Sequence, residues 1–274
     1  EEALGTGGGI RNVYDKLRND TVMVFNGDVL SGMDLEGILT THHDKDADVT
    51  MHLLNVADPR AFGCVPTDSN GRVTAFLEKT EDPPTNQINA GCYVFKRSVI
   101  ESIPANRVVS VERETFPGLL AEGRLVVGHV DNSYWRDMGR PDDFTRGSSD
   151  LVRGIAPSPL IEGKTGESLV DPSAGIAGGV LLLSGTAVGR GSEVGAGSRL
   201  EGTVVFDGVR IEPGAIIHNS IIASGAHIGA NAVIENCVIG EGAHIGARCE
   251  LLDGMRVFPG VSIPDAGVRF SSDA

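Results

Sequence analysis

The chain has 274 residues, of which 41% are hydrophobic and 22% are charged, a composition that is ordinary for a soluble globular protein with room for two domains. Its formal net charge of −14 argues against nucleic acid and anionic membranes as partners, because both require a basic surface. The apolar runs are too short to cross a bilayer, and no segment resembles a signal peptide. Four widely spaced cysteines without a CxxC pair predict reduced core residues in a cytoplasmic protein.

Residues 1–152 alternate between helix-like and strand-like patterns. Helices are expected over 10–17, 35–43, 97–103, 111–120 and 141–152, and strands over 22–25, 49–56, 92–95 and 125–130. Residues 64–66 and 73–77 flank the sequence DSNG, whose Asn-Gly pair is a hairpin signal. Alternation of this kind predicts an α/β domain built on a layered sheet.

Residues 153–167 contain two prolines and three glycines without any period, which predicts a linker. Residues 168–266 then follow a six-residue period. Aliphatic or aromatic residues recur at 16 positions from Ile176 to Ile263, Phe206 among them, and 12 of the 15 intervals are six residues long. This period fits neither a helix nor a plain strand, but it is typical of a parallel β-helix in which each hexad forms one flat side. Three sides per coil give about five coils, followed by a tail over 267–274, and a glycine-rich meander is the alternative.

The apolar run VMVF, residues 22–25, ends at Asn26-Gly27-Asp28. Ligands of open α/β sheets bind beyond the carboxyl ends of the strands, so the Asp28 carboxylate is a candidate metal ligand at such an end. A turn-forming aspartate is the alternative.

A second aspartate lies in YWRDMGRPDDF, residues 134–144, which holds the only tryptophan of the chain. Mg²⁺ is usually held by one or two carboxylates together with substrate phosphates, so Asp137 is expected to meet Asp28 as a second metal ligand. An aspartate at the start of the following helix is the alternative.

Glycines and polar residues at other strand ends are candidates for substrate contacts. The glycine-rich stretch LGTGGGI, residues 4–10, precedes a predicted helix and could bring backbone N–H groups close to a phosphate or a base, although a plain turn fits equally well. Glu78 and Lys79 in FLEKT could bind sugar hydroxyls and a phosphate, or form a solvated charge pair. Asn89 in INAGCYVF could both donate to and accept from a sugar, or form an Asx turn.

Taken together, these stretches resemble the sugar-1-phosphate nucleotidyltransferase family. The segments NGDVL, AFGCVPTD, FLEKT, INAGCYVF, SVERETFP and YWRDMGRPDDF carry the resemblance, which is closest to the bacterial mannose-1-phosphate guanylyltransferases. The hexad repeat resembles the left-handed β-helix of hexapeptide-repeat proteins. The resemblance implies a Rossmann-like nucleotidyltransferase core over 1–152, incomplete at its N-terminus, followed by a C-terminal left-handed parallel β-helix.

The resemblance also implies a reaction, in which GTP and mannose 1-phosphate give GDP-mannose and pyrophosphate. By the same resemblance, Asp28 and Asp137 hold Mg²⁺, and Lys79 binds the sugar phosphate and belongs with them to the catalytic group. The remaining substrate contacts are expected from Leu4, Gly5, Thr6 and Gly7 to the nucleobase and from Gly63, Glu78, Asn89 and Gly91 to the sugar. Another pair of substrates, such as glucose 1-phosphate with UTP, dTTP or ATP, is the alternative within the family.

The chain departs from the family pattern in two places. Thr80 stands where the family usually has proline, which leaves the two preceding functional side chains in place. The glycine-rich N-terminal signature of the family, with an arginine that grips the triphosphate, is absent from these residues. We therefore expect that the chain lacks an N-terminal segment and that these 274 residues alone have little transferase activity.

Two other functions remain open on the sequence alone. Hexapeptide β-helices often carry acetyl transfer with a histidine base, and the repeat contains His218, His227 and His244. A non-catalytic regulatory homologue is the other alternative, against which the retention of the predicted catalytic side chains speaks. In each case the β-helix is expected to mediate homo-oligomerisation, because an open solenoid end needs a cap or a partner.

Overall fold

The computed structural model describes residues 3–77, 79–161, 163 and 165–270. The chain folds into two compact units, Glu1–Trp135 and Arg136–Ala274. The division falls before helix α5 (Pro141–Val152), whereas the boundary expected from the sequence falls after it. Each unit is described by itself below.

The first unit is an α/β domain, as the alternating pattern predicts. Its helices are α1 (Gly5–Asn12), α2 (Leu35–Asp44), α3 (Arg97–Ser102) and α4 (Phe116–Ala121), with 3₁₀ turns η1 (Tyr14–Lys16) and η2 (Pro59–Ala61) and a π-helix, η3 (Val111–Thr115). Its strands are β1 (Thr21–Phe25), β2 (Val29–Ser31), β3 (Val49–Asn55), β4 (Gln87–Lys96) and β5 (Val126–Val130). Four of them form a mixed sheet in the order β1-β4-β3-β5, with β4 antiparallel to both neighbours and β5 parallel to β3.

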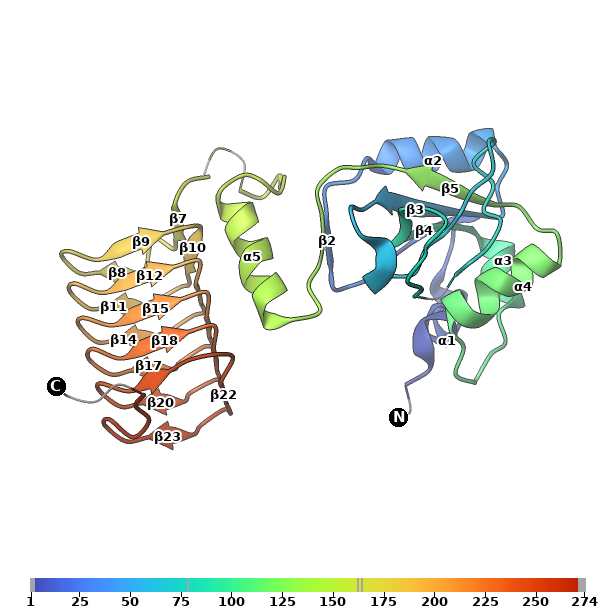
Figure 1. The fold of residues 1–274 in the computed structure, drawn as a ribbon. Helices are drawn as coiled ribbons and strands as arrows, with labels where there is room; N and C mark the ends of the chain where they lie inside the picture. Colours follow the sequence, from blue (N-terminus) through green and yellow to red (C-terminus); the bar gives the residue numbers. More distant parts are fainter. Residues whose placement is uncertain (1–2, 78, 162, 164, 271–274) are drawn as a thin grey trace. The chain divides into compact units, whose positions relative to one another are not determined.

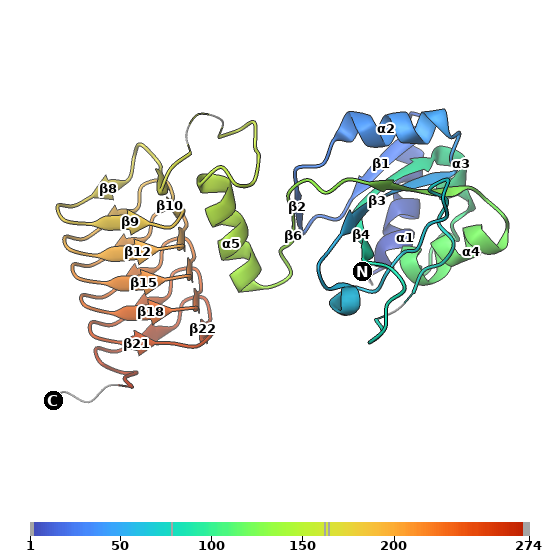
Figure 2. The same cartoon turned by 45° about the horizontal axis from the view of Figure 1, so that its top comes forward.

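Helices cover both faces of this sheet, and strand β4 shows why (Figure 1). Its residues alternate in direction, so Val94 packs with Ile38 of α2 on one face, while Phe95 packs with Val99 of α3 and Phe116 of α4 on the other. The turned view also shows α2 and α4 on opposite sides of the strands (Figure 2). A strand buried on both faces needs apolar residues at consecutive positions, which explains the unbroken run CYVF.

Three sequence predictions for the first unit need correction. The helix expected over 10–17 begins at Gly5 and ends at Asn12, so the glycine stretch is helical and is not a loop. The strand expected over 92–95 is ten residues long. The helix expected over 111–120 begins with a π-helical turn, in which the Phe116 N–H donates to the Val111 carbonyl five residues back. Because Pro117 has no N–H to donate, the helix is regular only after this turn.

The second unit combines α5 with a parallel β-helix, and β6 (Trp135–Asp137) crosses the division between the units. Over residues 165–270, three parallel sheets hold six, six and five strands, so the β-helix has about six coils rather than the predicted five. The strands are β7 (Ser168–Val170), β8 (Gly175–Ile176), β9 (Leu181–Leu183), β10 (Thr186–Val188), β11 (Glu193–Val194), β12 (Arg199–Glu201), β13 (Val204–Val205), β14 (Arg210–Ile211), β15 (Ile216–His218), β16 (Ile221–Ile222), β17 (His227–Ile228), β18 (Val233–Glu235), β19 (Val238–Ile239), β20 (His244–Ile245), β21 (Glu250–Leu251), β22 (Arg256–Val257) and β23 (Ser262–Ile263).

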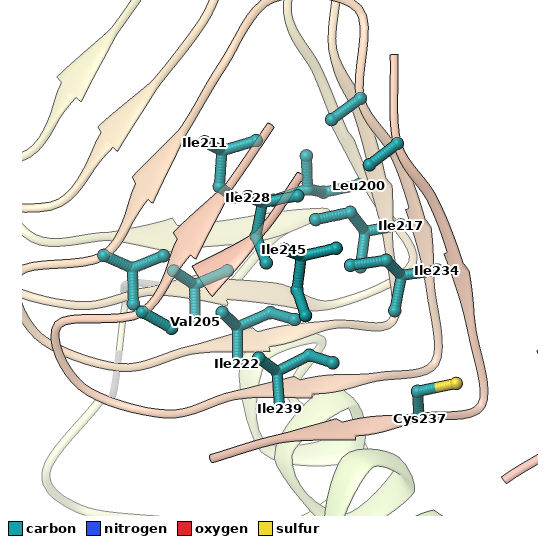
Figure 3. Close-up of a cluster of buried hydrophobic side chains, with 14 of the residues drawn as sticks. Leu200, Val205, Ile211, Ile217, Ile222, Ile228, Ile234, Cys237, Ile239 and Ile245 are labelled. Atoms are coloured by element: carbon teal, nitrogen blue, oxygen red, sulfur yellow. The ribbon is translucent and has the colours of Figure 1, made fainter. Parts of the chain in front are cut away.

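Inward aliphatic side chains stack from coil to coil and form the core of the β-helix (Figure 3). The register repeats after 17 residues in the middle coils, as in the column Val205, Ile222 and Ile239. The six-residue period expected from the sequence includes Phe206, but the inward position of this side of the coil is one residue earlier, because Val205 is 2% exposed and Phe206 is 40% exposed. Phe206 stacks instead on Phe144 of α5, with 6.4 Å between the ring centroids.

The corners of the coils explain why the repeat uses small residues. The Thr203 hydroxyl, which has one hydrogen to donate, lies 3.0 Å from the carbonyl oxygen of Glu201 and 3.3 Å from that of Ile217, so a buried hydroxyl lies between one coil and the next. Glycines at other corners lie against the backbone of the following coil. A Cβ at Gly195 would lie 2.5 Å from the Pro213 nitrogen, which no side chain can tolerate without a shift of the coil.

Two further predictions from the composition can be compared with the structure. All four cysteines are free and buried, as expected. Among the helices of the described residues, none has the length and the apolar composition that a bilayer crossing requires.

We expect Gly195→Ala to lower the free energy of unfolding of the β-helix by about 1–3 kcal/mol, because the new methyl group overpacks a coil junction. Gly178→Ala is the matched control, since a Cβ at Gly178 would meet no atom within 4 Å. Thermal unfolding followed by circular dichroism measures the difference. Equal melting temperatures for the two variants would contradict this account of the corner glycines.

We expect acid to weaken the first unit through His42, which is buried and lies 3.0 Å from the Thr50 hydroxyl through its Nδ1. Burial, with help from the neighbouring His43, lowers the pKa of His42 to about 4. An unfolded histidine titrates at about 6.5, so the unfolded state binds the proton more tightly. The contribution of His42 to stability is therefore complete above about pH 6.5 and is lost as the pH falls towards about 4.

Urea unfolding at pH 7 and pH 5, followed by the fluorescence of Trp135, measures this effect, because the only tryptophan of the chain lies in the first unit. The loss of stability between the two pH values is expected to shrink strongly in His42→Gln and only slightly in His43→Gln, because the exposed His43 contributes the smaller of the two named causes of the lowered pKa. If His42→Gln keeps the full pH dependence, another group is responsible.

Candidate functional site

The first unit contains a cavity of about 330 Å³, a volume within the range of sites for small molecules. It is lined by Phe62, Gly63, Cys64, Val65, Phe76, Leu77, Asn89, Glu112, Arg113 and Pro117. Two residues predicted to contact the sugar, Gly63 and Asn89, are therefore brought together although 26 positions separate them in the sequence. The cavity is the candidate site of the first unit.

A hairpin forms one wall of the cavity. Cys64 and Leu77 exchange both backbone hydrogen bonds at 3.0 Å, and Thr67 pairs with Val73 closer to the turn. Asp68 closes the turn, because its carboxylate accepts from the backbone N–H groups of Asn70 at 2.8 Å and Arg72 at 2.9 Å. The predicted hairpin is thus confirmed, and it brings Leu77 to the wall of the cavity.

Two predicted site residues follow this hairpin. Lys79, two positions after Leu77, is exposed. Glu78 lies outside the described residues. At the other strand of the hairpin, Gly63 has a φ of +73°, a backbone conformation that favours glycine.

Asn89 of β4 is held by three hydrogen bonds. Its amide nitrogen donates to the Tyr93 hydroxyl at 2.8 Å and to Glu112 Oε1 at 2.9 Å, and its Oδ1 accepts from the Gly91 N–H at 3.1 Å. Burial raises the pKa of Tyr93, so its hydroxyl stays protonated and neutral. The amide group of Asn89 is therefore fixed in one orientation at the cavity wall.

Glu112 is a residue of the cavity that the sequence reasoning did not single out. It lies in the π-helix η3, whose start is capped in two directions. The Ser110 hydroxyl accepts from the Arg113 N–H at 3.2 Å, while Glu114 Oε1 accepts from the Ser110 N–H at 3.2 Å. Arg107 holds Glu114 in turn through an ion pair of 2.8 Å. The only sequence signal was the segment SVERETFP, which contributed to the resemblance without a role for any one residue.

Gly91 brings two predicted segments together. Its φ is +79°, and a Cβ at this position would lie 2.8 Å from Nδ2 of Asn26. The Asn26 N–H donates to the Gly91 carbonyl at 2.8 Å, so the end of β1 lies beside the middle of β4. Asn26, which had no predicted role, owes its position to the missing side chain of Gly91.

The two predicted metal ligands are both exposed carboxylates. Asp28 lies in the turn between β1 and β2 in the first unit. Asp137 ends β6 in the second unit, where its Oδ1 accepts from the Gly139 N–H at 3.1 Å. Their pairing therefore stays a prediction. Within the described ranges, no group of three or more histidine, cysteine or acidic side chains is arranged to hold a metal ion.

The glycine-rich stretch has a structural reason that the sequence did not reveal. The N–H groups of Gly7 and Gly8 both donate to the Val109 carbonyl, at 2.9 and 3.3 Å, and a Cβ at Gly5 would lie 2.7 Å from the same oxygen. The glycines thus let α1 approach the segment before η3 closely. The predicted contacts with a nucleobase, from Leu4, Gly5, Thr6 and Gly7, stay a prediction. The Gly7 N–H already donates to the Val109 carbonyl within the protein.

Comparison with known proteins divides the chain after helix α5, close to the boundary expected from the sequence. Residues 1–154 match the nucleotidyl transferase family, and residues 164–267 match the family described as the GMPPB C-terminal domain. The mannose-1-phosphate guanylyltransferase of Mycobacterium tuberculosis is 65% identical over the whole of this chain and 76% of its own length. Mannose-1-phosphate guanylyltransferase 1 of Arabidopsis thaliana is 35% identical over 73% of this chain and 57% of its own length.

A third relative, the mannose-1-phosphate guanyltransferase of Neurospora crassa, is 34% identical over 64% of this chain and 51% of its own length. The chain thus spans about three quarters of the mycobacterial relative and little more than half of the plant and fungal ones. The match over residues 1–154 covers the cavity and every residue predicted from the resemblance to act in the site. The chain therefore belongs to the nucleotidyl transferase family.

Proposed function

We propose that the protein transfers GMP from GTP to mannose 1-phosphate and so produces GDP-mannose and pyrophosphate. The observation that carries this proposal is the 65% identity, along the whole chain, to a protein named mannose-1-phosphate guanylyltransferase. In the proposed reaction, a phosphate oxygen of mannose 1-phosphate attacks the α-phosphorus of GTP, and the bond to the bridging oxygen of pyrophosphate breaks.

The cavity of the first unit is the proposed place of the sugar. Its volume of about 330 Å³ is large enough for a hexose, and Gly63 and Asn89 present polar groups along its wall. Lys79 is proposed to neutralise the sugar phosphate as a cation at the rim, and Glu78 to bind sugar hydroxyls. These residues would accelerate transfer mainly by orienting the attacking oxygen and by offsetting negative charge.

Mg²⁺ is the proposed cofactor, with Asp28 and Asp137 as its protein ligands. The donor chemistry fits, because Mg²⁺ is normally held by one or two carboxylates together with phosphate oxygens and water. A third carboxylate is therefore not needed. When bound, the ion would supply positive charge that stabilises the negative charge developing on the phosphates. The roles of both aspartates rest on the family resemblance and on their exposed carboxylates.

The wider assignments remain proposals of the same kind. The choice of GTP and mannose over other nucleotides and sugars is supported by the names of the relatives. A cytoplasmic location is supported by four unpaired cysteines. Homo-oligomerisation through a left-handed β-helix is an expectation from the family and from the open end of a solenoid.

We expect pyrophosphate release with GTP and mannose 1-phosphate in the presence of Mg²⁺ to exceed release with UTP, dTTP or ATP and with glucose 1-phosphate. The grid is measured on the protein expressed from its natural start codon. A maximum with another pair would identify a different nucleotide and sugar phosphate as the substrates and would keep the reaction type. No turnover with any pair would refute nucleotidyl transfer and favour a regulatory homologue.

We expect Asp28→Asn and Asp137→Asn each to lower kcat by at least about a hundredfold with a smaller effect on KM, because the carboxylates act on charge that grows in the transition state. Asp44→Asn, at an exposed carboxylate that ends α2, is the matched control and should keep wild-type kinetics. A wild-type kcat in either of the first two variants would remove that residue from the proposed metal site.

We expect Gly91→Ala to reduce activity more than Gly71→Ala. Both glycines have similar φ values, +79° and +77°, so both variants bear similar backbone strain. Only the Cβ at Gly91 would displace Asn26, whereas the nearest atom to a Cβ at Gly71 is 3.6 Å away. Measured kcat/KM, compared at equal folded fraction, separates the two effects. Equal losses would show that strain alone matters at Gly91.

A further inference from the structure

The hydrogen bonds of Asn89 leave it little capacity for a substrate. Both N–H bonds of its amide are used within the protein, one by the Tyr93 hydroxyl and one by Glu112 Oε1. Its carbonyl oxygen already accepts from the Gly91 N–H. An amide has two donor hydrogens, so Asn89 cannot also donate to a sugar without breaking one of these bonds.

Glu112, in contrast to Asn89, keeps hydrogen-bonding capacity for a substrate. It is exposed, it lines the cavity, and among the described residues it accepts a single side-chain hydrogen bond, from Asn89 to Oε1. An ionised carboxylate can accept about four hydrogen bonds, two at each oxygen. Its Oε2 therefore has unused acceptor capacity, while the capped start of the π-helix fixes the backbone that carries it.

The two residues form a unit in which one orients the other. The bond from Asn89 fixes the rotation of the Glu112 carboxylate, because it holds Oε1 at 2.9 Å and leaves Oε2 for another donor. A ligand group that matches this position must donate a hydrogen bond and must not be an anion, because an anion would be repelled by the carboxylate. Sugar hydroxyls meet both conditions, whereas phosphate oxygens meet neither.

We propose that Glu112 accepts a hydrogen bond from a hydroxyl of the substrate sugar and that Asn89 is a positioning residue that acts through Glu112. The assignment rests on the proposed function, because it takes the cavity as the sugar site. It moves the role expected for Asn89 to a residue on a different element, the π-helix η3. It also makes Glu112 a determinant of specificity, because a sugar without the matching hydroxyl leaves the carboxylate desolvated and unpaired.

The first test uses Glu112→Gln, with Glu122→Gln as the matched control at an exposed glutamate that ends α4. Loss of a charge-assisted hydrogen bond is expected to raise KM for mannose 1-phosphate by about tenfold or more in Glu112→Gln. KM for GTP and the melting temperature should stay near the wild-type values. An unchanged KM for mannose 1-phosphate, or an equal rise in both KM values, would overturn the assignment.

The second test compares mannose 1-phosphate with its monodeoxy analogues. In the wild-type protein, removal of the recognised hydroxyl should reduce kcat/KM by about the same factor as Glu112→Gln does. In Glu112→Gln, the same analogue should lower kcat/KM only slightly further, because the residue that accepts from this hydroxyl has already been replaced. If each analogue lowers kcat/KM by the same factor in the wild-type protein and in Glu112→Gln, Glu112 does not contact a hydroxyl of the sugar.

The positioning role of Asn89 is tested by a double-mutant cycle. Asn89→Ala should raise KM for mannose 1-phosphate in the wild-type background but have a much smaller effect in the Glu112→Gln background, because it acts through that carboxylate. Equal effects in the two backgrounds would show that Asn89 contacts the sugar independently, which contradicts the proposal.

Binding measurements separate this inference from the proposed function. Isothermal titration of the full protein with mannose 1-phosphate detects the sugar site without turnover. If wild type binds the sugar phosphate but transfers no nucleotide, the proposed function fails, and weaker binding in Glu112→Gln still supports the assignment. If wild type binds no mannose 1-phosphate and transfers no nucleotide, both fail.

Discussion

The antiparallel pairing of β4 with both β1 and β3 is the constraint on which the rest of the first unit depends. One strand, Gln87–Lys96, supplies Val94 to the layer under α2 and Phe95 to the layer under α3 and α4. Its first half carries Asn89 to the cavity wall. The same hydrogen-bonded strand therefore anchors the core at one end and fixes the site at the other, and a shift of its register by one residue would exchange the two faces.

The second unit depends on a different constraint, the repetition of one coil. Each inward aliphatic side chain stacks on the residue 17 or 18 positions away, so the core continues along the axis without long-range crossovers. Glycines such as Gly195 keep the corners thin enough for the next coil, and hydroxyls such as that of Thr203 satisfy corner carbonyls. The stability of such an array comes from the packing of neighbouring coils on one another.

The sequence predicted the elements whose pattern is local. The period of the repeat revealed a β-helix, and the proline at the start of α5 marked that helix at its observed first residue. Prediction from the sequence failed where a tertiary contact decides the structure. The glycines of α1 read as a loop because their close approach to Val109 is invisible in the sequence, and Phe206 was read as a core residue because α5, which covers it, lies far away in the chain.

The candidate site shows the same limit more sharply. Gly63 and Asn89 were recognisable as single residues, since glycine and asparagine at strand ends have characteristic uses. Which groups of Asn89 remain available could not be read from the sequence, because that depends on Tyr93 four residues later and on Glu112 in another element. Hydrogen-bond saturation is a property of the folded network, so residue type alone overestimated what Asn89 can offer.

The charge of the protein places a final condition on any phosphate chemistry. A chain of net charge −14 repels a nucleoside triphosphate at long range, so negative charge must be offset close to the reacting atoms. The carboxylate of Glu112 at the cavity wall makes that part of the site suitable for neutral hydroxyls and unsuitable for phosphates. Binding of the sugar and neutralisation of the phosphates are therefore proposed to use different groups, with the cation of Lys79 and a divalent ion offsetting the phosphate charge. Such a separation would let an acidic protein select a sugar by its hydroxyls while still handling highly charged substrates.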